Sequence, residues 1–368
     1  MKNGKIASIV LAAGYSSRMN SFKPFLEFGG RTAVETVVNT LKDAGIEKII
    51  VVVGYRGSEV EDKLKDSGVI CIRNENYSQG MYSSVLKGVK FLDESIEAFF
   101  IMPVDIPLVK KHTLELMKRE YRRCGKGILY PVYCGKRGHP PLIDIKYRHP
   151  ILSGSGEGGL ERMLLNFPED SMEVAVFDSM VIMDMDEKKD YNALLNHYLS
   201  CAPNRSECNA ILKSYNVPEN IVRHCMEVAR VSLEILEHLK CCGHVLDAAA
   251  LEAAAMLHDI AKGEKNHDMK GAAILKEIGY ERVGYIISTH IDLDVDENGM
   301  ITENEILYLA DKLVKGDRVM PLEERRAQYM SVYNENMEAQ DKINKRFDTA
   351  GKILQKIKRI SGKGLIYE

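Results

Sequence analysis

The stretch KIASIVLAAG, residues 5–14, decides the architecture expected for the first half of the chain. Its apolar run from Ile6 to Leu11 is short and continuous, which is typical of a buried strand. Similar short runs recur at 48–53 (KIIVVV), 69–72 and 98–102 (AFFIM), with helical spacing at 33–44 and 80–92. Strands that alternate with helices in this way predict an α/β fold with a doubly wound, mostly parallel sheet.

Beyond about residue 125 this alternation becomes less regular. Strand-like pieces surround a glycine-rich loop, GSGEGG, at 154–159. We expect these strands at 128–133, 141–145, 173–177 and 180–184. The polar, proline-containing stretch 198–206 is interpreted as a linker, so a first domain is expected over residues 1–200.

The remainder of the chain shows only helical periodicity. Helices are expected at 221–239, 246–260, 267–278, 281–290, 303–315 and about 321–360, and no strand pattern is found among them. We therefore expect an all-α second domain over residues 205–368, with a C-terminal helical extension that packs or oligomerises.

The composition is that of an ordinary globular protein. Of 368 residues, 45% are hydrophobic and 28% charged, and the net charge of −3 includes no long block of one sign. Charge therefore gives no reason to expect a nucleic-acid or a membrane partner. The eight cysteines form no CxxC pair, and we find neither a signal peptide nor an apolar run near the roughly 20 residues that span a bilayer. A cytoplasmic location with reduced thiols is expected.

A candidate ligand-binding loop follows the first strand. It consists of Leu11, Ala12, Ala13 and Gly14, with Arg18 and Lys23 close behind. Small residues let the backbone approach phosphate oxygens, and two cations neutralise the charge of a triphosphate. A tight strand–helix turn with solvated charges is the alternative for the loop alone. Its place at the carboxyl end of a strand favours ligand binding.

Acidic residues follow two later strands. Asp105 comes directly after the strand at 98–102, where it suits a magnesium ion or, taken alone, a helix cap. Asp184 and Asp186 lie in the expected strand VIMDMD. Because residues i and i+2 share one face of a strand, both are candidates for the same metal ion.

Together these motifs resemble a known family. They are similar, in order, to motifs of the molybdenum cofactor nucleotidyltransferases, which have a glycosyltransferase-A-like pyrophosphorylase fold. The matching segments are LAAG-x-SSRM followed by KP, QGMYSS (79–84), MPVDIP (102–107), RGHPPL (137–142) and DMDEKKDY (184–191). The resemblance covers about residues 5–197.

The resemblance implies roles for individual residues. The nucleoside triphosphate would bind Leu11, Ala12, Ala13, Gly14, Arg18, Lys23, Gly80, Ser83 and Asp105. Magnesium would bind Asp105 with Asp184 or Asp186, and His139, otherwise a turn histidine, would lie near the phosphate-bearing acceptor. Arg18, Lys23 and Asp105 would be catalytic, in an attack of an acceptor phosphate on the α-phosphorus that releases pyrophosphate.

The resemblance also bears on base and acceptor. In the family, guanylyl-transferring members typically carry LAGG and cytidylyl-transferring members LAAG. The methyl group of Ala13 narrows the space next to the base, so CTP is expected as donor. The acceptor that the resemblance implies is molybdopterin or the molybdenum cofactor. One segment departs from the family: GEGGLER (156–162) stands where members often have a GD-x-GAR-like loop. A sugar or polyol phosphate stays open as the alternative acceptor.

The second half holds a separate set of polar residues on its expected helices. These are His224, His258, Asp259, His267, His290 and Asp311. A single histidine on an apolar helix face is more often hydrogen-bonded or solvated, as expected for His197, His238 and His244. Several imidazoles and carboxylates from separate helices can instead converge on a metal ion, without which their burial is costly.

This order, with HDIAK, H-x-x-x-GA and LADK around it, resembles the HD-domain phosphohydrolases over roughly residues 205–320, especially the subgroup that hydrolyses dinucleoside polyphosphates. The resemblance implies a metal site of His224, His258, Asp259 and Asp311, with Asp259 catalytic. His267 and His290 would complete a dinuclear centre of iron or manganese, with zinc or nickel as alternatives. Lys262, Lys312 and Arg318 are candidates for phosphate contact or for solvated charge.

The two resemblances together predict a bifunctional enzyme that transfers a nucleotidyl group and hydrolyses a phosphate ester or anhydride. The alternative is a sugar- or polyol-phosphate nucleotidyltransferase whose HD domain senses a nucleotide without turnover. The candidate protein partners are a molybdoenzyme and a second copy of the chain.

Overall fold

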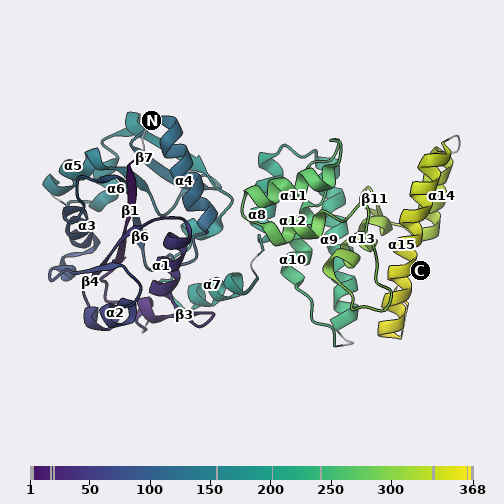
Figure 1. The fold of residues 1–368 in the computed structure, drawn as a ribbon, viewed down its shortest axis with the longest axis horizontal. Coiled ribbons are helices and arrows are strands. Elements are labelled where there is room, and N and C mark those ends of the chain that lie inside the picture. The colour runs from purple at the N-terminus through teal and green to yellow at the C-terminus, as the bar shows by residue number, and fades with distance from the viewer. Residues whose placement is uncertain are drawn as a thin grey trace. The chain divides into compact units, whose positions relative to one another are not determined.

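The computed structural model describes residues 4–16, 19, 21–154, 156–200, 202–240, 243–333, 336–362 and 364–365. The chain forms two compact units, Met1–Leu199 and Ser200–Glu368. The first combines a sheet with helices, and the second is almost entirely helical (Figure 1). The expected fold classes, α/β and then all-α, are confirmed.

The first unit is organised around one sheet of eight strands. β1 (Lys5–Ala12) lies between β6 (Ile96–Pro103) and β4 (Lys48–Val53), and all three are parallel. β8 and β9 run antiparallel to their neighbours, whereas the other pairings in the sheet are parallel. The remaining strands are β5 (Ile70–Arg73), β7 (Ile128–Tyr133), β8 (Lys136–Arg137), β9 (Leu142–Asp144) and β10 (Ser171–Ala175), in the order β10-β7-β9-β6-β1-β4-β5 with β8 beside β7.

Burial on both faces explains why the central strands are continuous apolar runs. Every residue of β1 after Lys5 and of β4 after Lys48 is buried. One face is covered by α3 (Met81–Lys90), α5 (Arg148–Ser153) and α6 (Gly159–Leu164), and the other by α1 (Ala33–Asp43) and α4 (Lys111–Cys124) (Figure 1). The unit also contains α2 (Gly57–Leu64), α7 (Lys188–Ser200) and a small hairpin of β2 (Glu27–Phe28) and β3 (Arg31–Thr32).

The strand expected at 180–184 is wrong. Ser179–Ile182 form a 3-10 turn, which begins where the Asp178 carboxylate accepts a hydrogen bond from Met180 N at 3.2 Å. Val181 O accepts from His139 N at 2.7 Å and not from a neighbouring strand. The apolar spacing of this segment reflects burial of Met180 and Val181. The expected linker is also shorter than 198–206, because α7 extends to Ser200 and the next helix begins at Arg205.

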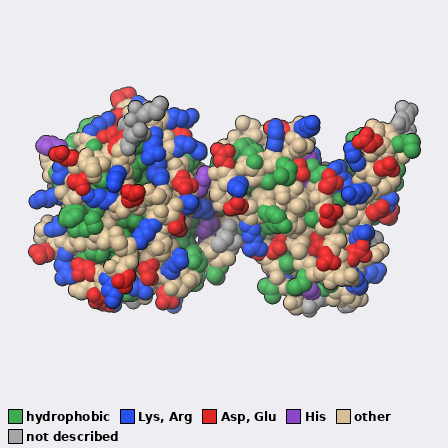
Figure 2. All heavy atoms as spheres, in the orientation of Figure 1, with side chains coloured by type: hydrophobic (Ala, Val, Ile, Leu, Met, Phe, Trp, Pro, Cys, Tyr) green, Lys and Arg blue, Asp and Glu red, His purple; other side chains and the backbone are tan. Residues whose placement is uncertain are grey.

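The second unit is a bundle of helices. Its central helix, α9 (Glu219–Lys240), packs against α10 (Ala248–Leu257) and α13 (Glu303–Leu313). The others are α8 (Arg205–Ser214), α11 (His267–Glu277), α12 (Glu281–Ile287), α14 (Leu322–Val332) and α15 (Met337–Ser361). None of the described helices is long and apolar enough to cross a membrane. Figure 2 shows Lys and Arg side chains interspersed with Asp and Glu on the face drawn of each unit.

Two details differ from the helices expected here. The stretch 321–360 forms two helices, because α15 has its own N-cap, in which the Asn336 side chain accepts from Ala339 N at 3.0 Å. A short hairpin, β11 (Val314–Lys315) and β12 (Arg318–Val319), turns at Gly316, whose φ of 60° suits glycine. Strands of two residues are too short to leave a periodic signal in the sequence.

Candidate functional site

The first candidate site is a cavity of about 290 Å³ at the carboxyl ends of β1 and β6. These strands are parallel neighbours with Leu11 opposite Pro103, so the loops that follow them meet at one edge. Val104 N donates to Leu11 O at 3.1 Å and joins the two loops. The cavity is lined by Leu11, Ala12, Ala13, Gly14, Tyr15, Ser16, Lys23, Pro24, Tyr77, Ser78, Gly80, Met81, Ser84, Pro103, Val104 and Asp105.

The loop after β1 is held in place by its neighbours. Tyr55 N donates to Ala13 O at 3.1 Å, which ties the loop to the end of β4. A Cβ atom on Gly54 would lie 2.8 Å from Tyr77 Cβ and 2.9 Å from Ala13 Cβ, so only glycine lets these residues approach. The small side chains of the loop therefore face a cavity whose walls are fixed.

Lys23 brings a positive charge to this cavity. Its amide N donates to Ser16 Oγ at 3.0 Å, and its ammonium group lies 3.2 Å from Asp105 Oδ2 and 2.7 Å from Asp186 Oδ1. Burial alone would lower the pKa of Lys23, but Asp186 and Asp105 outweigh burial and raise it. The side chain is therefore a permanent cation.

The acidic segment 184–186 reaches the same edge although it is not a strand. Met185 N donates to Asp105 O at 2.9 Å, which holds the two acidic segments together. Burial, followed by the charges of Asp186 and Asp105, raises the pKa of Asp184. The edge thus carries more negative charge than Lys23 neutralises. Carboxylates beside a cavity suited to phosphate fit a magnesium ion, which is typically bound by one or two carboxylates plus phosphate oxygens.

Other residues expected in the nucleotide site fall in different places. Gly80 lines the cavity, but Ser83 is not among the lining residues. The Ser83 hydroxyl bonds to the carbonyl oxygens of Asn76 and Gly80, at 2.9 and 2.8 Å, and so shapes the loop. Ser84 lines the cavity instead. Arg18 lies outside the described residues.

Sequence reasoning missed an aromatic group at this cavity. The ring of Tyr15 lies 5.4 Å from that of Tyr55 and 5.1 Å from that of Tyr77, and both Tyr15 and Tyr77 line the cavity. The available signal was the position of Tyr15 directly after Gly14. Tyr55 and Tyr77 come from distant loops, and no local pattern points to them.

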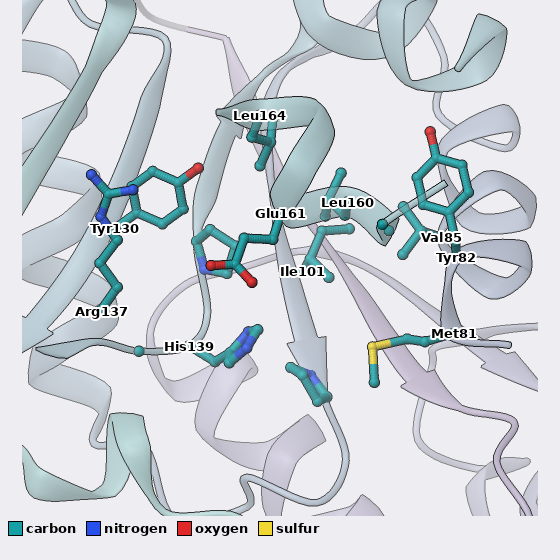
Figure 3. A pocket seen from close by; sticks show the side chains of 15 residues that line it. Met81, Tyr82, Val85, Ile101, Tyr130, Arg137, His139, Leu160, Glu161 and Leu164 are labelled. Carbon is teal, nitrogen blue, oxygen red and sulfur yellow. The ribbon is translucent and has the colours of Figure 1, made fainter. Parts of the chain in front are cut away.

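A second cavity, of about 340 Å³, adjoins the first, since Met81 and Pro103 line both. Its walls are largely apolar and aromatic (Figure 3). They include Tyr82, Val85, Ile101, Tyr130, Leu160 and Leu164. The second cavity is therefore suited to a flat, ring-containing part of a ligand. A ligand in the first cavity could reach it across Met81 and Pro103.

Three polar side chains line the second cavity. The Arg137 guanidinium lies 4.5 Å from the Tyr130 ring centre, and its Nε donates to Glu173 at 2.8 Å. The Glu161 carboxylate points toward the middle of the cavity in Figure 3. Nδ1 of His139 is buried with no partner among the described residues, and burial lowers the pKa of His139. The imidazole is therefore neutral near pH 7.

The second candidate site lies inside the helical unit. The structure brings together all six residues expected there, of which His258 and Asp259 are fully buried and His290 is 2% exposed. They come from α9 (His224), the end of α10 (His258 and Asp259), the start of α11 (His267), the segment after α12 (His290) and α13 (Asp311).

Backbone carbonyl groups orient three of the imidazole rings. Nδ1 of His224, His258 and His290 lies 2.9, 2.8 and 2.7 Å from the oxygens of Gly316, Ala255 and Ile287 respectively. A proton on each Nδ1 would leave each Nε2 lone pair facing the cluster. Metal-binding histidines are oriented in the same way.

Asp259 lies at the centre of the cluster. Its Oδ1 is 3.2 Å from His267 Nε2 and 3.5 Å from His290 Nε2, and its Oδ2 is 3.6 Å from His258 Nε2. Two groups are compact enough to hold an ion each, and Asp259 belongs to both: one with His224 and His258, the other with His267 and His290. Asp311 Oδ1 adjoins the first group, 3.1 Å from His224 Nε2.

The chemistry of this cluster fits metal ions. His258 Nε2 is buried with no hydrogen-bond partner among the described residues, which is costly without a ligand. Burial would raise the pKa of Asp259, but His258, His267 and His290 bring it well below its usual value. The donors are thus an ionised carboxylate and imidazole nitrogens, a set that suits divalent transition metals.

Two of the three expected phosphate contacts border the cluster. Lys262 Nζ lies 2.9 Å from Asp259 Oδ2, and Lys312 Nζ lies 2.7 Å from Asp311 Oδ2. Lys312 also donates to His290 O at 3.1 Å. Arg318 is exposed on β12.

Comparisons with known families cover both sites. Residues 8–171 match the family described as "MobA-like NTP transferase domain", and residues 221–316 match "HD domain". The chain contains both domains. The MobA-like domain holds the two adjoining cavities, and the HD domain holds the histidine and aspartate cluster.

Relatives of known name match the MobA-like domain. The chain is 27% identical over 195 residues to the molybdenum cofactor cytidylyltransferase of Escherichia coli (strain K12), covering 52% of this chain and 97% of that protein. It is 37% identical over 123 residues to the bifunctional IPC transferase and DIPP synthase of Rubrobacter xylanophilus, covering 32% of this chain and only 27% of that protein. Among solved structures, a nucleotidyl transferase from Methanothermobacter thermautotroptrophicus is 23% identical, with a TM-score of 0.45 over 54% of this chain and 99% of that one.

Proposed function

We propose that the MobA-like domain transfers a nucleotidyl group from a nucleoside triphosphate to a phosphorylated acceptor, with magnesium. The observation that carries this proposal is the Lys23 ammonium, held between Asp105 and Asp186 at a cavity lined by a small-residue loop. A triphosphate in this cavity would meet backbone N–H groups on one side and the charged edge on the other. Nucleotide transfer is also the chemistry of the family that residues 8–171 match.

The acidic and basic side chains at this cavity would have different roles. Asp105 and Asp186 would hold magnesium, which when bound neutralises phosphate oxygens and stabilises charge on the leaving pyrophosphate. Lys23, which stays protonated, would donate to the same oxygens as charge builds up. An oxygen of the acceptor phosphate attacks the α-phosphorus, and the bond from that phosphorus to the pyrophosphate oxygen breaks.

We propose CTP as the donor and molybdopterin as the acceptor. The name of the relative from Escherichia coli, a molybdenum cofactor cytidylyltransferase, supports a cytidylyl donor and an acceptor of the molybdenum-cofactor class. The methyl group of Ala13 at the edge of the first cavity supports CTP. The apolar, aromatic second cavity suits the ring body of such an acceptor better than a hydroxyl-rich sugar. Its junction with the first cavity at Met81 would leave the acceptor phosphate near the nucleotide.

The test of this proposal is pyrophosphate release by the full chain with magnesium, each of the four nucleoside triphosphates, and molybdopterin or a sugar phosphate as acceptor. We expect release with CTP and molybdopterin. Release only with a sugar or polyol phosphate would move the assignment to the alternative acceptor class.

For the HD domain we propose hydrolysis of a phosphate ester or anhydride. Bound metal ions, iron or manganese in the first instance, would polarise the phosphate and acidify water. Asp259 would hold both ions, and Lys262 and Lys312 beside it would contact phosphate oxygens. Dinucleoside polyphosphates are the first substrates to assay. A purified chain with no bound transition metal and no hydrolysis after metal addition would favour the nucleotide-sensing alternative.

A further inference from the structure

A third constellation lies between His290 and Asp311, outside both sites. Residues 294–305 read DVDENGMITENE, and we call them the cation loop. In calcium-binding loops of 12 residues, side-chain oxygens stand at positions 1, 3 and 5, glycine at 6, a backbone carbonyl ligand at 7 and glutamate at 12. The cation loop matches every one of these positions, with Asp294, Asp296, Asn298, Gly299, Met300 and Glu305.

A positive charge already occupies this loop, and it belongs to Lys356 of α15. Its Nζ donates to Asp296 O at 2.8 Å, Met300 O at 3.1 Å and Glu305 Oε1 at 2.7 Å. Met300 O and the Glu305 carboxylate are the ligands that a calcium loop offers at positions 7 and 12. Lys356 is 2% exposed and Glu305 4% exposed. A buried ammonium group is thus held by two of the oxygens that a calcium loop offers, and by the backbone oxygen of Asp296 in place of its carboxylate.

Neighbouring cations on α15 add to this arrangement. Lys352 Nζ lies 2.9 Å from Glu297 Oε1, and the Arg359 guanidinium contacts Glu297 O. Residues 352, 356 and 359 share one face of the helix because they are four and three positions apart. One face of α15 therefore supplies the positive charge that the acidic loop requires.

We propose that the cation loop is a calcium-type site whose resident cation is the Lys356 ammonium, so that removing this group opens the site to Ca²⁺. The tethered ammonium competes well with a free ion because it is already held in place by the fold. Asp294 and Asn298 are exposed and would add oxygens that Lys356 does not use, toward the 6–8 ligands that calcium takes.

The geometry departs from a calcium loop at two points, which is consistent with a different cation. Gly299 does not have the positive φ found at many other glycines of the chain. Glu305 Oε2 accepts from Thr302 N at 2.9 Å as part of the N-cap of α13, so one carboxylate oxygen faces the ammonium. Calcium in place of the ammonium would have to recruit further oxygens.

The experiment compares the wild-type chain with Lys356→Met, which keeps an apolar side chain of similar length without the charge. Thermal unfolding and calorimetric titration are measured with Ca²⁺ up to about 1 mM, the weak end of the range for such loops, and with Mg²⁺. We expect no calcium response of the wild-type chain at this loop. The variant should unfold at a lower temperature, recover in Ca²⁺ but not in Mg²⁺, and gain one saturable calcium site.

Two controls locate the effect. Lys356→Met with Asp294→Asn should lose the calcium response, because position 1 of the loop is removed. Lys352→Met removes only the exposed ion pair with Glu297, so this variant should not gain a calcium response. Calcium bound at the other sites is common to all variants and cancels in the comparison.

Three outcomes would overturn the proposal. One is a wild-type chain that binds Ca²⁺ as tightly as the Lys356→Met variant. Another is failure of both Lys356→Met and the smaller Lys356→Ala to gain a calcium site. The third is a pair of variants that stay unfolded with and without Ca²⁺, since the ion should replace the missing charge.

Discussion

The ammonium group of Lys23 lies 2.7 Å from Oδ1 of Asp186, across 163 residues of sequence. Asp105 Oδ2 lies 3.2 Å from the same nitrogen. The three side chains come from the segment after β1, the segment after β6 and the segment before α7, and the hydrogen bond from Met185 N to Asp105 O holds the last two segments together. At this charged edge of the first cavity we expect substitutions to change the reaction rate more than the stability of the fold.

Lys23→Met should lower the rate of pyrophosphate release at saturating nucleotide by about 10²–10³-fold, the usual effect of removing one donor to developing charge. Lys23→Arg keeps the positive charge, so its rate of pyrophosphate release should lie between the rates of Lys23→Met and the wild type. The readout is initial rate at several nucleotide concentrations. A Lys23→Met variant within about twofold of the wild-type rate would exclude a part for Lys23 in stabilising the transition state.

Asp105→Asn should abolish pyrophosphate release and leave hydrolysis by the HD domain unchanged. The substitution keeps the shape of the side chain but removes a carboxylate that suits magnesium. Both activities are assayed on the same preparation, and circular dichroism checks the fold. Loss of both activities in a folded variant would mean that the two sites do not work independently.

Asp259→Asn should have the reverse effect. Because Asp259 belongs to both groups of candidate metal-binding residues, we expect the variant to lose bound transition metal. Its rate of hydrolysis should fall by more than about 100-fold, because losing only a hydrogen-bond partner of a metal ligand can already lower activity by about that much. Metal content is measured by elemental analysis per chain. A variant that keeps the metal content of the wild type would contradict the central position of Asp259.

His139 should make the stability of the MobA-like domain depend on pH. Burial lowers the pKa of His139, against the charges of Asp105 and Glu161. Below the ordinary histidine pKa of about 6.5 the unfolded chain therefore binds a proton that the folded chain does not. The free energy of unfolding should then decrease as the pH is lowered, by no more than about 1.4 kcal/mol per pH unit.

The test compares urea unfolding of the wild-type chain and His139→Asn at about pH 5.5 and pH 7.5, on either side of that value. The variant should gain stability relative to the wild type on going to the lower pH. An equal difference between the two proteins at both pH values would show that His139 has no depressed pKa in the folded state.

Gly88→Ala should destabilise the MobA-like domain although alanine favours helices. A Cβ atom at Gly88 of α3 would overlap Ile9 Cγ2 and lie 3.2 Å from Val52 Cγ2 in the core. Overpacking costs about 1–3 kcal/mol, which exceeds the gain of about 1 kcal/mol in helix propensity.

The matched control for Gly88→Ala is Gly351→Ala in α15, where a Cβ atom would meet nothing within 4 Å. This substitution should stabilise the HD domain by up to about 1 kcal/mol. Both effects are read from chemical unfolding. Stabilisation by Gly88→Ala would mean that α3 and β1 pack less closely than the structure has them.

Local patterns predicted the elements whose signal is strong. The apolar runs at 48–53 and 128–133 coincide with β4 (Lys48–Val53) and β7 (Ile128–Tyr133). The apolar residues before Asp184 predicted a strand, but Met180 and Val181 are buried by packing, and the Asp178 cap begins a 3-10 turn there. Apolar spacing alone does not separate these two cases.

The sites were predictable to different degrees. The six residues of the HD cluster follow one another in a recognisable order, and they lie on five separate segments of the helical unit. Tyr77 lines the first cavity and Tyr55 packs against Tyr15, and both come from loops far from Tyr15 in sequence, so no local pattern marks them. Lys356 lies 51 residues from Glu305, and its burial in the cation loop required the packing of α15.

The most direct measurement is calorimetric titration of the full chain, as the Asp259→Asn variant to prevent hydrolysis, with CTP, GTP, ATP and UTP in the presence of magnesium. We predict that one nucleotide binds per chain, that CTP binds more tightly than the other three, and that Asp105→Asn weakens its binding. Preference for UTP, ATP or GTP, or binding that Asp105→Asn leaves unchanged, would contradict this prediction.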